Sequence, residues 1–392
     1  MEKNMRPMAQ LIRINFTLAI LLSISLVGCT DRETGMSADM SKERVNRVAT
    51  EHGILEGAWS QTDASIGVFR GIPYAQPPVD DLRWREPQAL ASWTGVRQAT
   101  QFGAACWQAY SEDAFVWSRG EFPRSEDCLH LNIWQPVKTN ATAPVMVWFH
   151  GGAHTGGFAH VELFDGSELA RQGVVVVTVN YRLGPWGFLA HPALAEESER
   201  NSTGNYGLMD KIAALKWVQK NIQGFGGNPN NVTIFGQSAG SSSVCALMAS
   251  PLTSGLFHKA IGQSAACLAK EKRDANGQER GARLAQLALG KSSAQDSDDK
   301  ISAKELRGID NETLLSAMQN SDWSLASRIV VDGWVLPQAP IEVFSANQQA
   351  KVPLMVGSLA NEGHELLPLN NALTESELDQ YLNKSFADSA AK

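Results

Sequence analysis

Apolar residues in this chain form short continuous runs that alternate with longer periodic segments. Residues 144–149 (PVMVWF) and 173–179 (GVVVVTV) are apolar at nearly every position, which is typical of strands buried on both faces of a sheet. Residues 232–235 (VTIF) predict a third short strand, and residues 206–222 have helical periodicity. The apolar side of that helix contains Leu208, Ile212, Leu215 and Val218. This alternation predicts an α/β domain whose central, mostly parallel sheet is flanked by helices.

Composition narrows the class of protein without identifying it. The 392 residues are 43% hydrophobic and 19% charged, with 33 glycines, which fits a globular protein and argues against disorder, collagen or coiled coil. Lys and Arg number 34 against 41 Asp and Glu, a net charge of −7. No basic run interleaved with aromatic residues is present in the sequence, so nucleic acid is not an expected partner. The charge-rich stretch 270–304 predicts a surface insertion that contains a helix.

The first 28 residues have the pattern of an export signal. Lys3, Arg6 and Arg13 form a basic start, and residues 16–27 are mostly apolar but too few to span a bilayer. The segment ends in Leu-Val-Gly-Cys, which resembles the lipobox of bacterial lipoproteins, whose cysteine takes the lipid; here that residue is Cys29. A plain signal peptide cut near Gly28, or a buried N-terminal helix, are the alternatives.

These features predict three segments. Residues 1–28 are the signal, residues 29–50 form a flexible tether, and the folded domain occupies residues 51–392. We expect the protein to be exported and anchored to a bacterial membrane through Cys29, or otherwise secreted.

The five cysteines agree with an oxidising compartment. With Cys29 lipidated, four remain, and an even number favours disulfides. Spacing alone allows three pairings. Our choice is the nearest-neighbour one, Cys106 with Cys128 and Cys245 with Cys267. A metal site is the rival interpretation, but neither a C-x-x-C motif nor clustered histidines support it.

The most specific motif is Gly236-Gln237-Ser238-Ala239-Gly240, directly after VTIF and before a run of small residues. A G-x-S-x-G sequence between a strand and a helix is the nucleophile elbow, which lifts the serine hydroxyl out of the sheet. The backbone N–H of the residue after the serine, Ala239, then points at the oxyanion that forms during acyl transfer.

A second glycine-rich loop follows another predicted buried strand. The sequence His150-Gly151-Gly152-Ala153 has almost no side chains, so its N–H groups can turn inward and complete an oxyanion hole. We expect His150 to be a structural residue of this loop and not a base.

Long blocks of sequence make a family resemblance specific. They include 71–87 (GIPYAQPPVDDLRWREP), 125–134 (SEDCLHLNIW), 179–194 (VNYRLGPWGFLAHPAL), 204–240 and 250–265. The chain resembles the type-B carboxylesterase/lipase family, the cholinesterase-like branch of the α/β-hydrolases, from residue 53 to the end. The resemblance implies the α/β-hydrolase fold, a small-molecule ester substrate, and neither metal nor cofactor.

The resemblance also assigns roles to matching residues. Ser238 looks like the nucleophile and Glu362, after the run VPLMVG, like the acid that orients the catalytic imidazole. The expected oxyanion donors are Gly152, Ala153 and Ala239, with Gly151, Gly236 and Gly240 supporting the turns. Cys106 and Cys128 match the family's first disulfide. Gln237, Asn228 and Asn361 stand where the family usually has acidic residues.

The general base is the one family residue for which the resemblance assigns no matching position. In the family a histidine follows the acid by on the order of a hundred residues, whereas this sequence ends 30 residues after Glu362 and its last histidine is His364. We therefore expect a C-terminally incomplete α/β-hydrolase; His154 and His160 are the alternative bases. The predicted function is serine ester hydrolysis with its activity in doubt, and the alternative is a catalytically inactive, cholinesterase-like binding or adhesion lipoprotein.

Overall fold

A computed structural model describes residues 46–110, 122–136, 142–265, 275–291, 300–321, 323, 329–362, 374–377 and 379–380. The described residues belong to one compact unit, Val45–Lys392, and the predicted signal and Cys29 lie outside the described residues. Strand β1 (Asn46–Thr50) pairs with β2 (Gly53–Trp59), so regular structure begins inside the segment expected to be a tether. The burial of Val48 against the core explains this difference.

One large sheet carries most of the described strands. Its order is β1-β2-β3-β7-β9-β8-β10-β11-β12, with β4 on β2. The remaining bounds are β3 (Ile66–Pro73), β4 (Val96–Gln98), β7 (His130–Pro136), β8 (Ala143–Phe149), β9 (Val175–Val179), β10 (Gly227–Gln237), β11 (Lys259–Gln263) and β12 (Leu354–Gly357). Strands β5 (Ala105–Cys106) and β6 (Arg124–Ser125) form a separate pair.

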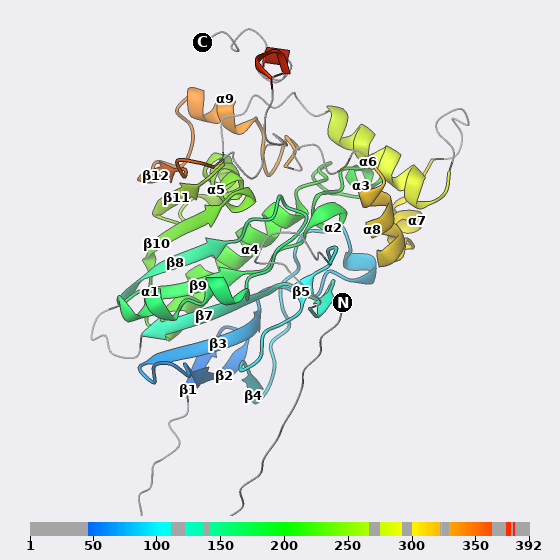
Figure 1. Cartoon of the computed structure of the whole chain (residues 1–392). Helices are drawn as coiled ribbons and strands as arrows, with labels where there is room; N and C mark the ends of the chain where they lie inside the picture. The colour runs from blue at the N-terminus through cyan, green and yellow to red at the C-terminus, as the bar shows by residue number, and fades with distance from the viewer. Residues whose placement is uncertain are drawn as a thin grey trace, which may run out of the picture. The chain divides into compact units, whose positions relative to one another are not determined.

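The sheet is mixed, and its two halves differ. Strands β9, β8, β10, β11 and β12 are parallel to one another, whereas β1, β2, β3, β7 and β9 pair antiparallel in that order. The carboxyl ends of parallel strands meet at one edge of a sheet, which is where α/β proteins place their ligand sites. The loops after β8, β10 and β12 therefore open at the same edge (Figure 1).

Helices cover both faces of the sheet. They are α1 (Ser167–Arg171), α2 (Gly184–Phe188), α3 (Pro192–Glu196), α4 (Tyr206–Asn221), α5 (Ala239–Ala249), α6 (Ala275–Ala288), α7 (Ala303–Arg307), α8 (Asn311–Gln319) and α9 (Pro340–Ser345). Helix α1 packs with Trp134 and Val176 in a small apolar cluster, and α4 and α5 pack on the main core with Val175 and Val177. Alternate residues of β9 therefore face opposite layers, as expected for a strand buried on both faces.

The predicted elements are present. The runs 144–149 and 232–235 lie in β8 and β10, the run 173–179 contains β9, and the periodic segment 206–222 contains α4. The insertion 270–304 contains α6 and the first residues of α7. Helix α4 is buried on more than its apolar side, however, because Asp210 and Lys211 are also fully buried.

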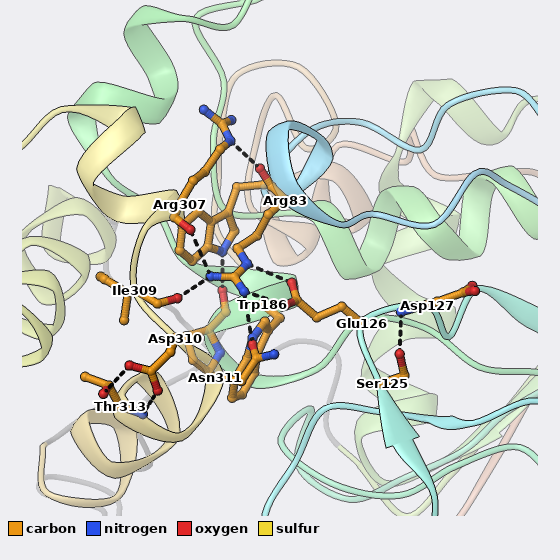
Figure 2. Close-up of polar contacts among 12 residues, drawn as sticks. Arg83, Ser125, Glu126, Asp127, Trp186, Arg307, Ile309, Asp310, Asn311 and Thr313 are labelled. Carbon is orange, nitrogen blue, oxygen red and sulfur yellow. Dashed lines mark hydrogen bonds and ion pairs between the residues drawn. The ribbon is translucent and has the colours of Figure 1, made fainter.

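An arginine-centred network fastens the N-terminal part of the domain to its later helices. Arg83 donates from Nε to Glu126 at 2.7 Å, and it also donates to the carbonyls of Arg307 and Ile309. The Asn311 side chain accepts hydrogen bonds from Arg83 and, at 2.7 Å, from Trp186 of α2 (Figure 2). Because the Arg83 side chain is only 10% exposed, its charge needs these partners.

Candidate active site

Ser238 stands in the turn between β10 and α5. Its φ of 53° and ψ of −121° place it in a strained conformation that a residue with a side chain adopts only where the surrounding structure imposes it. The imposing contacts include a hydrogen bond of 2.8 Å from its N–H to the carbonyl of Gln263 on β11. The half-buried side chain therefore stands at the carboxyl end of β10, as the G-x-S-x-G motif predicts.

The two glycines of the motif allow close packing of strand, turn and helix. A Cβ on Gly240 would lie 2.0 Å from the carbonyl oxygen of Phe149 at the end of β8. A Cβ on Gly236 would lie 2.6 Å from the carbonyl carbon of Gly240. Both contacts are with backbone, so any larger residue would push α5 away from the sheet.

The loop after β8 passes directly beside this turn. Three successive residues, Gly152, Ala153 and His154, have φ values of +100°, +53° and +59°. The Gly152 carbonyl accepts hydrogen bonds from the N–H groups of Thr155 and Gly156, at 2.9 and 3.0 Å, which closes a tight turn. A Cβ on Gly151 would lie 3.2 Å from the Cβ of Ser238, so the loop that carries Gly152 and Ala153 runs against the turn that carries Ser238 and Ala239.

Buried side chains make hydrogen bonds to the loop that follows β8. The Tyr181 hydroxyl donates to the His150 carbonyl at 2.7 Å, and the two rings stack with centroids 4.3 Å apart. Gln108 accepts from the N–H of Gly157 at 2.7 Å and donates to its carbonyl at 2.9 Å. Burial lowers the pKa of His150 to about 3, so its ring is neutral near pH 7. That His150 is a structural residue of this loop stays a prediction.

Glu362 follows β12 at the same edge of the sheet. Its carboxylate accepts a hydrogen bond of 2.7 Å from the N–H of Leu359. Glu362 lines a groove of about 590 Å³ together with Trp148, Ser264 and Gln237, the residue before Ser238. The predicted acid and the predicted nucleophile thus belong to neighbouring loops.

The two alternative bases occupy different surroundings. His154 is buried, and its Nε2 lies 3.1 Å from the hydroxyl of Ser243 on α5. His160 stacks on Phe102 with ring centroids 5.1 Å apart, and burial lowers the pKa of its imidazole to about 4. His364 lies outside the described residues.

The cysteine prediction is resolved for one pair. Cys106 and Cys128 form a disulfide with their Cα atoms 4.9 Å apart, which confirms that pairing. Cys245 of α5 is also in a disulfide, and its predicted partner Cys267 lies outside the described residues, so that pairing stays a prediction.

Within the described ranges no helix is long and apolar enough to cross a bilayer. In the same ranges, histidine, cysteine, aspartate and glutamate side chains nowhere gather in threes as metal ligands would.

The sequence did not predict the buried charged residues near Tyr181, which are Arg182, Asp210 and Lys211. Arg182 and Asp210 form a buried ion pair, with Nη2 and Oδ1 2.7 Å apart, directly after β9 and inside α4. Lys211 points its ammonium at the face of Tyr181, 3.0 Å from the ring centroid, and burial lowers the pKa of this amine. Two adjacent charged residues, Asp210 and Lys211, within an apolar helical pattern could have indicated buried charge in this helix.

Comparison with known proteins agrees with this geometry. Fumonisin B1 esterase of Sphingopyxis macrogoltabida is 41% identical over 346 residues, which are 87% of this chain and 61% of that protein. Para-nitrobenzyl esterase of Bacillus subtilis is 38% identical over 352 residues, 88% of this chain and 69% of that protein. A solved structure of a PNB esterase superposes with a TM-score of 0.74 at 35% identity, covering 88% of this chain and 70% of that one.

The superposition confirms the α/β-hydrolase fold. The chain spans less than two thirds of the length of fumonisin B1 esterase, the relative with the higher identity of the two. The model of the Carboxylesterase family matches residues 44–392, which is nearly all of the chain outside the predicted signal and tether. This protein therefore belongs to the carboxylesterase family.

Proposed function

We propose that this protein is a carboxylic ester hydrolase that forms an acyl intermediate on Ser238. The observation that carries the proposal is the strained Ser238 turn lying against the glycine-rich loop at Gly151. That juxtaposition is what acyl transfer requires, a raised nucleophile beside backbone N–H donors. Relatives named as esterases support the same reaction class.

The proposed reaction has two balanced halves. The Ser238 oxygen forms a bond to the ester carbonyl carbon while its proton passes to a base, and the new oxyanion accepts hydrogen bonds from the N–H groups of Gly152, Ala153 and Ala239. Collapse breaks the ester C–O bond, and the alcohol leaves with the proton. Water then attacks the acyl-serine in the same way, releasing the carboxylic acid and restoring the hydroxyl.

The rate of ester hydrolysis depends on the general base. In serine hydrolases the base is an imidazole oriented by an acid, and here Glu362 is the proposed orienting acid. Of the two alternative bases, His154 contacts the Ser243 hydroxyl and His160 stacks on Phe102. Loss of the base costs about 10⁶ in turnover, leaving about 10³–10⁴ over water from the oxyanion hole and binding. We propose that residues 30–392 hydrolyse esters only slowly.

Two assays on the purified protein test these parts. Mass spectrometry should find slow phosphonylation by a fluorophosphonate at Ser238, absent in Ser238→Ala and retained in Ser242→Ala, a neighbouring serine. Hydrolysis of a p-nitrophenyl ester should exceed background only slightly. Robust turnover that depends on Ser238 would refute slow hydrolysis and direct the search for a base to His154 and His160. No labelling at Ser238 would favour a binding lipoprotein instead.

We further propose that the protein is exported and lipid-anchored through Cys29. The basic start, the apolar core and the Leu-Val-Gly-Cys sequence support this proposal. Wild type should partition with membranes and carry a lipid on Cys29, whereas Cys29→Ala should be released or left unprocessed. Unchanged membrane association of the variant would contradict the anchor.

A further inference from the structure

We propose that His154 is a positioning residue of the oxyanion hole, and that it acts by tying the loop after β8 to helix α5 through Ser243. The Nε2 atom of His154 lies 3.1 Å from the Ser243 hydroxyl, across 89 positions of sequence. One end of this hydrogen bond adjoins Ala153, and the other lies one helical turn after Ala239. The inference rests on the proposed function, in which both alanines are oxyanion donors.

His154 occupies a backbone conformation that needs to be held. Its φ of +59° follows a φ of +53° at Ala153, and left-handed residues other than glycine cost roughly 1–2 kcal/mol each. The His154 carbonyl accepts a hydrogen bond of 2.6 Å from the N–H of Gly184, and its ring packs on Phe188 with centroids 5.0 Å apart. The residue is buried, so its side-chain bond is formed away from solvent.

Ser243 transmits the contact to the nucleophile turn. Its hydroxyl is fully buried in α5 and donates to the carbonyl of Ala239 at 2.9 Å. When the Ser243 proton is donated to Ala239, the hydroxyl accepts from His154 in the tautomer that carries its proton on Nε2. The bonds therefore run from the His154 ring through Ser243 to the carbonyl of Ala239, the residue whose N–H is the proposed oxyanion donor.

This chain of contacts joins the two arms of the proposed hole. Gly152 and Ala153 come from the loop, whereas Ala239 comes from α5, and each arm belongs to a different element. A misplacement of about 1 Å can cost about 10²-fold in rate. A fixed contact between the arms therefore has a catalytic consequence although neither His154 nor Ser243 is assigned a role in bond making.

Four variants separate the hydrogen bond from packing. His154→Phe keeps an aromatic ring against Phe188 but cannot donate, and Ser243→Ala removes the acceptor without changing the backbone. His154→Gln keeps a donor at a similar reach, so it should rescue. His191→Phe is the matched control, because His191 is also buried and makes one side-chain hydrogen bond, to the N–H of Ala193 at the start of α3.

Two readouts are needed, one of which does not require activity. Amide hydrogen exchange of the peptide covering residues 150–157 should accelerate about tenfold in His154→Phe and Ser243→Ala, since one buried hydrogen bond is lost. The second-order rate of fluorophosphonate labelling at Ser238 should fall about tenfold in the same variants, less than the 10²–10³-fold that loss of an oxyanion donor costs. A double variant that combines His154→Phe with Ser243→Ala should show no larger change in either readout than the single variants. His154→Gln and His191→Phe should leave both readouts near wild type.

Each outcome is decisive. Unchanged exchange in Ser243→Ala would overturn the tie itself, whether or not the protein is active, and this variant decides the matter if His154→Phe fails to fold. Faster exchange with unchanged labelling of a reactive Ser238 would overturn the positioning role. Faster exchange in variants of a protein whose wild-type Ser238 does not react would support the tie and refute the proposed function.

Discussion

Replacing Asp210 with asparagine tests whether the buried ion pair between Arg182 and Asp210 is needed for folding. Asp210 is fully buried, and its carboxylate accepts from the Arg182 backbone N–H at 2.9 Å and from Nε and Nη2 of the same residue. Asparagine keeps the shape but removes the charge and turns an amide donor toward guanidinium donors. Apart from this pair, the Arg182 side chain donates to the carbonyl of Arg85 at 2.9 Å.

The size of the effect follows from burial. Breaking a buried pair by removing one partner costs about 3–5 kcal/mol, because the remaining charge is left uncompensated. The Arg182 side chain is only 3% exposed, so water cannot replace the lost partner. For a large domain each kcal/mol of lost stability lowers the melting temperature by roughly 2–4 °C. At roughly 2 °C per kcal/mol, the expected decrease is roughly 6–10 °C.

Thermal and urea unfolding followed by circular dichroism measure this effect. Glu312→Gln is the matched control, because it breaks the pair between Arg124 and a carboxylate that is 69% exposed. An exposed pair contributes about 0–1 kcal/mol, so this variant should melt within a few degrees of wild type. Equal melting temperatures for the two variants would refute the reasoning from burial.

Three further results are expected. Burial holds the pKa of His150 at about 3, below its unfolded value, so the folded state binds fewer protons and stability is lost as pH falls from about 6.5 toward 3. His150→Phe should flatten the pH dependence of unfolding by about 1.4 kcal/mol per pH unit, and an unchanged slope would contradict this assignment. Replacing Cys106 and Cys128 by serine opens a loop of 22 residues and should cost about 3 kcal/mol in urea unfolding, where no change would refute a stabilising bridge. Strand β12 ends the described sheet and its Val356 is 72% exposed, so Val356→Lys should reduce edge-to-edge association measured by light scattering; equal scattering would contradict association through this strand.

The sequence alone determined the local elements and the nucleophile turn. Continuous apolar runs at 144–149 and 173–179 predict buried strands because a strand covered on both faces has no polar side. The glycines at 236 and 240 predict the elbow because only glycine fits where helix and strand backbones touch. These constraints act between residues close together in the sequence, so they can be recognised without the tertiary structure.

Tertiary structure decided which distant residues meet. Helical periodicity marks Leu208 and Leu215 as core, but it cannot show that Asp210 is buried too, since its partner Arg182 comes from another element. The start of the sheet at Asn46 was missed for the same reason, because β1 is short and is held by pairing with β2.

The contact between His154 and Ser243 shows the limit most clearly. Both residues stand beside motifs that the sequence identifies, yet nothing within either motif specifies a hydrogen bond across 89 positions. The parallel pairing of β8 with β10 fixes the loop and α5 side by side, and that register is set by the whole sheet. Sequence therefore determined the chemical groups at this site, whereas the tertiary packing of strands determined how they are joined.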